Sequence, residues 1–328
     1  MGKISSLIER AKKDPKRIVL AESCDERVLA AAKRITSEKI AELVLIDEAG
    51  ALKKASELAA EIIVPSEYSR IDEVAKKIYE LKKHKGITEK DAKAALLKDP
   101  LCLAAMLTRL GIADGFVAGA AHMTRDVVRA AINYMEIDRS TAMVSGAFLI
   151  ELADPSFGAS GFFVFSDCGV VPMPSAKQLA RIAVSAGDLL EKLFEIKPRI
   201  AFLTYSSKGS AEGESVERAK EAVVKVKEKR PDFIVDGELQ FDTATVPEVA
   251  KRKAPDSPIK GDANVLIFPD LDAGNITYKA VERLARATAV GPALLGFTKP
   301  ASDLSRGSSA DDIVNATALT VVRAQLGI

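Results

Sequence analysis

Short apolar segments alternate with longer amphipathic segments along most of the chain. Near the N-terminus, residues 17–21 and 41–46 are mostly apolar, and a helix-forming segment from Asp25 to Lys39 separates them. Buried strands of parallel sheets give apolar runs of this kind, and the helices between them cover both faces of the sheet. The pattern continues with another helix and a strand at Ile62–Val64, so it predicts an α/β fold.

The first half of the chain continues to about residue 141, and the same order recurs in a second block that starts near Ala142. A charged, helix-rich segment at 71–110 precedes a strand at Gly115–Gly119 and a helix that begins near Thr124. Further strands are predicted at 144–152, 161–166, 200–203, 233–235 and 265–268, with helices at 176–195 and 215–229. No long Ser/Gly-rich linker separates the halves, and both predict the same architecture.

Composition narrows the class of protein. The 328 residues suit two domains of roughly 100–200 residues each. Lys and Arg total 47 against 46 Asp and Glu, so the charge balance points to neither nucleic acid nor a membrane surface. The N-terminus lacks the apolar core of a signal peptide, and no uncharged stretch reaches the roughly 20 residues of a membrane span. Three widely separated cysteines fit a reducing compartment, so we expect a cytoplasmic protein.

Hydroxyl, guanidinium and carboxylate groups gather in residues 299–313, where a loop broken by Pro300 and Gly307 leads into the last predicted helix. Backbone amides at a helix start favour anions, and Arg306 adds a planar fork that suits a phosphate or a carboxylate. These residue types therefore predict an anion-binding or catalytic site at this junction.

Helix capping explains part of the same segment. Ser308 or Ser309 suits the N-cap, and Asp311 or Asp312 three positions later completes a common capping arrangement, worth about 1 kcal/mol. Capping gives no reason for the Ser-Arg pair at 305–306, so both interpretations stay open.

The chain lacks the motifs of other common phosphate and cofactor sites. No G-x-G-x-x-G follows a strand, and the Gly-rich segment at 209–213 lacks the Lys-Ser/Thr pair of a Walker A loop. Asp270, Asp272 and Asn275 suggest either cation ligands or, more in keeping with their place, the polar start of a helix. No metal-ligand set emerges.

Residues 303–307 (Asp-Leu-Ser-Arg-Gly) and 309–314 (Ser-Ala-Asp-Asp-Ile-Val) closely resemble the signature of phosphate acetyltransferases, or phosphotransacetylases. Segments at 119–122, 203–210, 235–242, 253–258 and 263–275 also resemble this family, in family order and over nearly the whole chain. The resemblance implies two three-layer α/β domains with mainly parallel sheets and an interdomain cleft, similar to isocitrate and isopropylmalate dehydrogenases. It places the first domain at 1–139 plus 296–328 and the second at 140–295.

The resemblance also implies a reaction. Acetyl-CoA and phosphate give CoA and acetyl phosphate, reversibly, in a ternary complex that needs no covalent enzyme intermediate. The family's roles assign Asp312 as the general base, Ser305 to transition-state stabilisation and Arg306 to substrate binding or orientation. Coenzyme A is a substrate, so no cofactor is implied, and activation by a monovalent cation stays open. A homodimer is expected from the resemblance, and twofold dimers are the commonest oligomers.

The base assignment has to overcome a pKa mismatch. A free Asp near pKa 3.9 facing a thiol near 8.5 makes proton transfer roughly 6 kcal/mol uphill. We therefore expect burial and the neighbouring Asp311 to raise the pKa of Asp312, and Arg306 to lower that of the thiol.

Two further cations are implied for binding CoA. Arg129 matches one family position, whereas Lys82 stands where the family usually has Arg, which keeps the charge but loses the bidentate fork and predicts weaker CoA binding. Lys82 also lies in a charged run that equally suits a solvated surface. His122, between a strand and a helix, and Ser308 are further candidates for the cleft, although a lone His is more often structural. Ser308 replaces the Cys of many relatives, which argues against an obligatory thiol nucleophile.

Three alternative functions would fit part of the same pattern. A phosphate butyryl- or propionyltransferase would differ in pocket size, which the sequence does not reveal. A non-catalytic relative used for oligomerisation or regulation is disfavoured because Ser305, Arg306 and Asp312 are all present. An oxidoreductase on a similar scaffold is disfavoured because the dinucleotide motif is absent from the sequence.

Overall fold

The computed structural model describes residues 2–50, 52 and 58–328, which form two compact units. Unit 1 contains the residues up to Ile4 and Asp138–Gly296, and unit 2 contains Ser5–Ile137 and Phe297–Ile328. The last segment of the chain therefore packs with its N-terminal part. Nowhere in the described ranges is a helix both long and apolar enough to cross a membrane.

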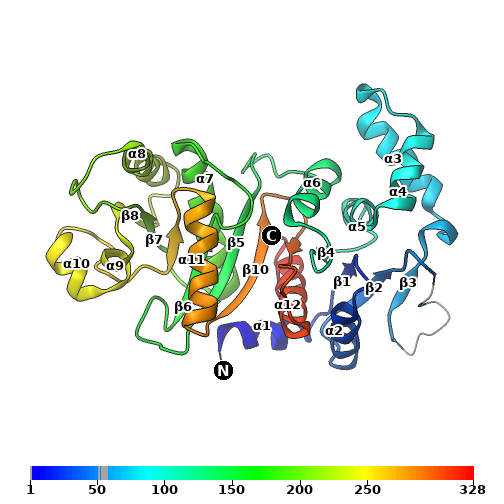
Figure 1. Ribbon diagram of the computed structural model, residues 1–328, viewed down its shortest axis with the longest axis horizontal. Helices are drawn as coiled ribbons and strands as arrows, with labels where there is room; N and C mark the ends of the chain where they lie inside the picture. The colour runs from blue at the N-terminus through cyan, green and yellow to red at the C-terminus, as the bar shows by residue number, and fades with distance from the viewer. Residues whose placement is uncertain (1, 51, 53–57) are drawn as a thin grey trace. The chain divides into compact units, whose positions relative to one another are not determined.

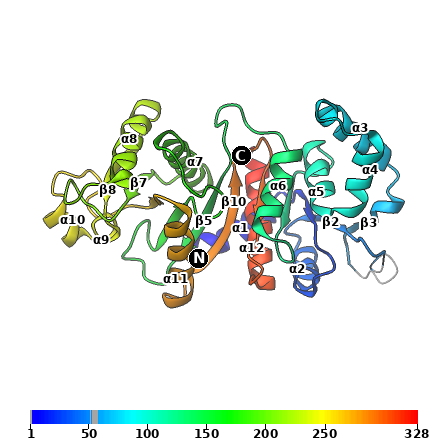
Figure 2. The same ribbon diagram turned by 45° about the horizontal axis from the view of Figure 1, so that its top comes forward.

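Unit 2 is built on a parallel sheet. Its strands are β1 (Arg17–Leu20), β2 (Glu42–Ile46), β3 (Glu61–Ile63), β4 (Gly115–Ala118) and β11 (Ala301–Asp303), in the order β3-β2-β1-β4-β11. Its helices are α2 (Glu26–Ser37), η2 (Pro65–Glu67), α3 (Ile71–Lys82), η3 (Lys83–Lys85), α4 (Glu89–Lys98), α5 (Pro100–Arg109), α6 (Thr124–Tyr134) and α12 (Ala310–Leu326), and α1 (Lys3–Ala11) leads into the unit. Helices α2 and α12 pack on one face of the sheet, and α5 and α6 pack on the other (Figures 1 and 2).

Burial explains the apolar segments of unit 2. Strand β4 is buried along its whole length, and α5 is buried from Pro100 to Thr108. Helix α12 is buried at most positions from Ile313 to Arg323, because it packs against both the sheet and α2. Burying one large aliphatic side chain contributes about 1.5–3 kcal/mol, so this packing fixes where α12 begins relative to the strand ends.

Unit 1 has a mixed sheet in the order β10-β5-β6-β9-β7-β8. Its strands are β5 (Ser145–Glu151), β6 (Phe162–Ser166), β7 (Arg199–Leu203), β8 (Ile234–Leu239), β9 (Val265–Ile267) and β10 (Thr288–Leu295). Its helices are α7 (Ala176–Phe194), α8 (Glu214–Lys229), α9 (Phe241–Thr245), α10 (Pro247–Lys253) and α11 (Leu271–Leu284). Strand β5 is antiparallel to β6 and β10, and the other pairs are parallel. Aromatic residues fill the core around Phe148, whose ring stacks on Tyr278 at a centroid distance of 4.0 Å.

The structure confirms the α/β class with mainly parallel pairing and most of the predicted elements, with small shifts at their ends. One prediction is wrong: residues 301–303, assigned to a loop, form β11, which pairs with β4. Its three residues, Ala-Ser-Asp, are too short and too polar to give the apolar run of a buried strand. The helix predicted between residues 46 and 62 falls largely on residues 51 and 53–57, outside the described part of the chain.

Candidate functional site

Three loops of unit 2 follow the carboxyl ends of neighbouring parallel strands. They are residues 21–25 after β1, 119–123 after β4 and 304–309 after β11. Parallel strands end at the same edge of a sheet, and ligands of open α/β sheets bind outside that edge. All seven candidate site residues predicted from the sequence belong to unit 2.

The junction between the last loop and α12 has the predicted cap. Ser309 is the N-cap, and its Oγ accepts a hydrogen bond from the backbone N–H of Asp312 at 3.2 Å. In return, Oδ2 of Asp312 accepts from the backbone N–H of Ser309 at 2.8 Å and from its hydroxyl at 2.9 Å. The capping interpretation is therefore confirmed. Both bonds to Asp312 use Oδ2, no hydrogen bond from the described residues reaches Oδ1, and the residue is half-buried.

Ser305 and Arg306 lie in the loop before that cap. The Oγ of Ser305 accepts the backbone N–H of Gly307 at 3.2 Å, which leaves the hydroxyl proton available as a donor. Arg306 is exposed, and within the described ranges its guanidinium makes no hydrogen bond or ion pair. A planar fork without a protein partner is suited to bind an oxyanion in two-point fashion.

Asp311 faces a different partner. Its carboxylate forms an ion pair with Arg34 of α2 at 2.7 Å. The negative charge that was expected to act on Asp312 is therefore compensated by a neighbouring guanidinium.

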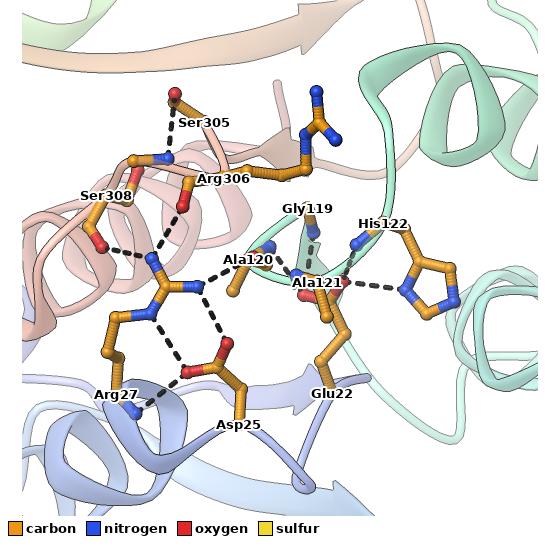
Figure 3. Close-up of polar contacts among 11 residues, drawn as sticks. Glu22, Asp25, Arg27, Gly119, Ala120, Ala121, His122, Ser305, Arg306 and Ser308 are labelled. Atoms are coloured by element: carbon orange, nitrogen blue, oxygen red, sulfur yellow. Dashed lines mark hydrogen bonds and ion pairs between the residues drawn. The ribbon is translucent and has the colours of Figure 1, made fainter.

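The loop after β4 encloses a buried carboxylate. Glu22 accepts hydrogen bonds from four successive backbone N–H groups of residues 119–122 at 2.7–2.9 Å (Figure 3). Its Oε1 also lies 2.7 Å from Nδ1 of His122. The four amides all donate to this carboxylate, so the carboxylate is the acceptor in its contact with the imidazole as well. The ring nitrogen Nδ1 is therefore the donor and carries a proton. Glu22 thus fixes both the turn and the ring of His122.

Arg27 joins the three loops. Its guanidinium binds the carboxylate of Asp25 through two hydrogen bonds, at 3.0 and 2.7 Å. It also donates to the backbone carbonyls of Ala120, Arg306 and Ser308 at 2.7–2.8 Å (Figure 3). The Arg27 guanidinium lowers the pKa of Asp25 below its usual range, mainly through these side-chain hydrogen bonds. Ser308 is buried and supplies its carbonyl to this network.

His122 and Arg129 border one pocket of about 360 Å³. Asp126 and Tyr134 also line it. Arg129 has 67% of its side chain exposed and lies 3.4 Å from Asp126, a weak contact for an ion pair. The structure therefore brings two of the predicted residues to one hollow with an accessible guanidinium.

Lys82 is not the fully solvated residue that its charged run suggested. Its Nζ lies 3.8 Å from the ring centroid of Tyr134, and the residue is half-buried. Burial lowers the pKa of Lys82 below its ordinary value. Since Tyr134 lines the pocket, Lys82 is attached to the same site through a cation–π contact.

The remaining predictions outside unit 2 are structural. Asp270 is the N-cap of α11 and accepts from the backbone N–H of Ala273, as the capping interpretation predicts. Across the described ranges, no group of three or more His, Cys, Asp or Glu residues is placed to hold a metal ion. Cys168 is fully buried just after β6, in keeping with a packing role.

Sequence reasoning missed Glu22 and Arg27. The available signal was the segment Glu22-Ser23-Cys24-Asp25-Glu26-Arg27, in which charged residues directly follow a buried strand and open a helix. Its polar residues suggested only a helix start.

Comparisons with known proteins agree over almost the whole chain. A family model described as Phosphate acetyl/butaryl transferase matches residues 3–321. The phosphate acetyltransferase of Clostridium acetobutylicum is 46% identical over 335 aligned positions, which cover 100% of both chains. The crystal structure of a phosphotransacetylase from Streptococcus pyogenes is 38% identical, covers 98% of each chain and superposes with a TM-score of 0.89. A 4-hydroxythreonine-4-phosphate dehydrogenase from Klebsiella pneumoniae, 12% identical over 95% of this chain and 100% of its own with a TM-score of 0.53, shares the fold alone.

Proposed function

This chain belongs to the Phosphate acetyl/butaryl transferase family, and on that premise we propose that it transfers an acetyl group reversibly between coenzyme A and inorganic phosphate. The resemblance seen in its sequence is confirmed by matches over its full length. The residue roles that follow are supported by the geometry of unit 2.

Asp312 acts as the general base. In the direction of acetyl-CoA synthesis, its carboxylate takes the proton of the CoA thiol, the sulfur attacks the acetyl carbonyl carbon, and the bond from that carbon to the phosphate oxygen breaks. The oxygen atom Oδ1 serves this step, because Oδ2 is engaged by the helix cap. General base catalysis of this kind contributes about 10²–10⁴-fold in rate.

Ser305 and Arg306 act on the other reactant. The Ser305 hydroxyl donates to the carbonyl oxygen as negative charge develops there, while its own lone pair holds the Gly307 amide. The Arg306 guanidinium binds the phosphate group and, near the thiol, favours the thiolate. Because Arg34 compensates the charge of Asp311, we assign the main assistance to proton transfer to Arg306, which favours the thiolate.

The pocket beside α6 binds the phosphate groups of CoA. Arg129 and Lys82 supply positive charge there, and His122, oriented by Glu22, lines the same hollow. Coenzyme A is a substrate, so the proposed reaction uses no cofactor. Activation by a monovalent cation is a separate question for the assay. We place the enzyme in the cytoplasm as a homodimer.

The observation that carries the proposal is a loop–helix junction that matches the family signature and holds both an unengaged Arg306 fork and, six positions later, an Asp312 carboxylate whose Oδ1 accepts no hydrogen bond from the described residues. The test follows CoA thiol release from acetyl-CoA with and without phosphate, and repeats it with butyryl-CoA. Release that requires phosphate and is faster with acetyl-CoA supports the proposal. Release that ignores phosphate would indicate a thioesterase, and preference for butyryl-CoA would assign the longer-chain activity.

A further inference from the structure

We propose that Arg27 is a positioning residue for this reaction: its guanidinium sets the loop that carries Ser305 and Arg306 by binding the carbonyls on either side of Gly307. The inference rests on the proposed function. Arg27 touches no substrate in this account, and it acts through the backbone of the loop.

The hydrogen bonds of Arg27 are complete. A guanidinium has five N–H donors in a rigid plane, and all five are used. Nε and one N–H of Nη2 bind the two oxygens of Asp25, at 3.0 and 2.7 Å, and the other N–H of Nη2 binds the carbonyl of Ala120 at 2.8 Å. Nη1 binds the carbonyls of Arg306 and Ser308 at 2.7 and 2.8 Å.

This geometry fixes the position of one reactive loop relative to two others. The loop has a turn of its own, in which the Ser308 amide donates to the carbonyl of Ser305 at 2.8 Å. That turn sets the shape of the loop but not its position relative to the rest of unit 2. Arg27 sets this position, because it also binds Ala120 in the loop after β4 and Asp25 at the start of α2. Since the Arg306 carbonyl is one of the anchored groups, Arg27 determines where the Arg306 side chain starts.

A purely structural role predicts something different. A partly exposed Arg–Asp pair at a helix start contributes little to stability, so losing it alone would leave the rate almost unchanged. A reactive group displaced by about 1 Å, by contrast, lowers the rate by about 10²-fold. Lysine keeps the charge at position 27 but has neither the plane nor the five donors.

The test compares Arg27→Lys with Arg34→Lys. Arg34 also lies on α2 and also contacts the α12 region, through Asp311, but it holds no loop carbonyl. We expect R27K to lower kcat 10- to 100-fold and to raise KM for phosphate, while KM for CoA changes less than threefold. In R34K, kcat and both KM values should change less than threefold. In an Arg306→Lys background, R27K should lower kcat by a clearly smaller factor than it does alone, because part of its effect is exerted through the position of the Arg306 side chain.

A second readout does not depend on activity. Amide hydrogen exchange of a peptide covering residues 304–309 should be faster in R27K than in R34K and wild type, with similar melting temperatures. Unchanged exchange and unchanged kcat in R27K would overturn the inference. So would a loss of kcat on adding R27K to R306K as large as in the wild-type background, or a loss of kcat accompanied by a matching drop in melting temperature. Failure of the proposed function would look different: the wild-type enzyme itself would show no phosphate-dependent transfer.

Discussion

At the scale of single residues, the proposed role of Asp312 combines two tasks that seemed to compete in the sequence. Its Oδ2 closes the capping box with Ser309, and its Oδ1 is left for chemistry. The cap holds the carboxylate in one rotamer at the start of a helix, which is what a general base needs in order to meet a proton at a fixed place. Capping and catalysis are therefore compatible at this position.

Lys82 gives a prediction at the same scale. Lys82→Arg should lower KM for CoA severalfold with little change in kcat, because a guanidinium stacks on Tyr134 as well as an ammonium does and adds a bidentate fork for a phosphate. Steady-state kinetics with varied CoA measure this. Lys83→Arg is the matched control, since Lys83 is exposed and pairs with Glu80. Equal KM values for K82R and wild type would remove Lys82 from the CoA site.

At the scale of elements, the site depends on where α12 begins. Ser309 and Asp312 define that point in unit 2, and the same capping box, made by Ser175 and Gln178, starts α7 in unit 1. The two helices thus offer an internal comparison between a cap near the proposed chemistry and a cap that serves structure.

Removing either cap should destabilise its helix by a similar amount. Ser309→Ala and Ser175→Ala should each cost about 0.5–2 kcal/mol of unfolding free energy, seen as lower midpoints in thermal and urea unfolding. Only S309A should also change kcat, because Asp312 then loses the two hydrogen bonds that it makes with the Ser309 hydroxyl, and these help to hold its carboxylate in place. An equal change of kcat in S175A would show that activity follows general stability and not the position of Asp312.

Strands could be predicted from the sequence wherever a buried strand is made of consecutive apolar residues. The sequence did not predict β10 at Thr288–Leu295, because Gly291 and Pro292 interrupt the strand pattern. The structure tolerates both residues because the register with β5 shifts between Val290 and Ala293. Strand β11 was not predicted because its burial comes from its place in the sheet beside β4 and not from a run of apolar side chains.

The site residues were predictable only where a residue type itself signals chemistry. Ser305, Arg306 and Asp312 stood out by their chemistry and by family resemblance. Arg27 did not, since its partners are backbone carbonyls as far as residue 308, and no local pattern records which carbonyls a distant loop will present. Glu22 was missed for the same reason, because its partners are backbone amides of residues 119–122.

At the scale of the whole molecule, the two units share a layered α/β plan but differ in what they contribute to this account. All the proposed catalytic and CoA-binding residues lie in unit 2, although they come from two separate segments of the chain, 82–129 and 305–312. Unit 2 also carries a buried acid, Asp303, at the end of β11.

Asp303 makes the stability of the protein depend on pH. Burial raises the pKa of Asp303 to about 7, outweighing the Thr124 hydroxyl and the Leu304 amide that oppose it. In the unfolded chain the group has its ordinary pKa near 3.9, so as pH rises from about 4 to 7 the unfolded state loses the proton first. The folded state therefore loses stability over that window, by up to an amount on the order of 4 kcal/mol, and no more above it.

Asp303→Asn should remove this dependence, because the amide does not ionise. Urea unfolding of wild type and D303N between pH 4 and pH 8 measures it. The variant should gain stability relative to wild type as pH rises to about 7, with a constant difference beyond. A difference that stays the same at every pH would contradict a raised pKa at Asp303.

The most direct measurement of the central claim is the turnover of Asp312→Asn beside Asp311→Asn in phosphate-dependent acetyl transfer. The amide keeps an acceptor for the Ser309 cap but cannot take a proton, and Asp311 lies one position away with its carboxylate on Arg34. We predict that D312N lowers kcat about 10²–10⁴-fold, with wild-type folding, and that D311N stays within about threefold, as expected for a surface pair. A D312N enzyme that keeps most of its turnover would show that this carboxylate is not the base.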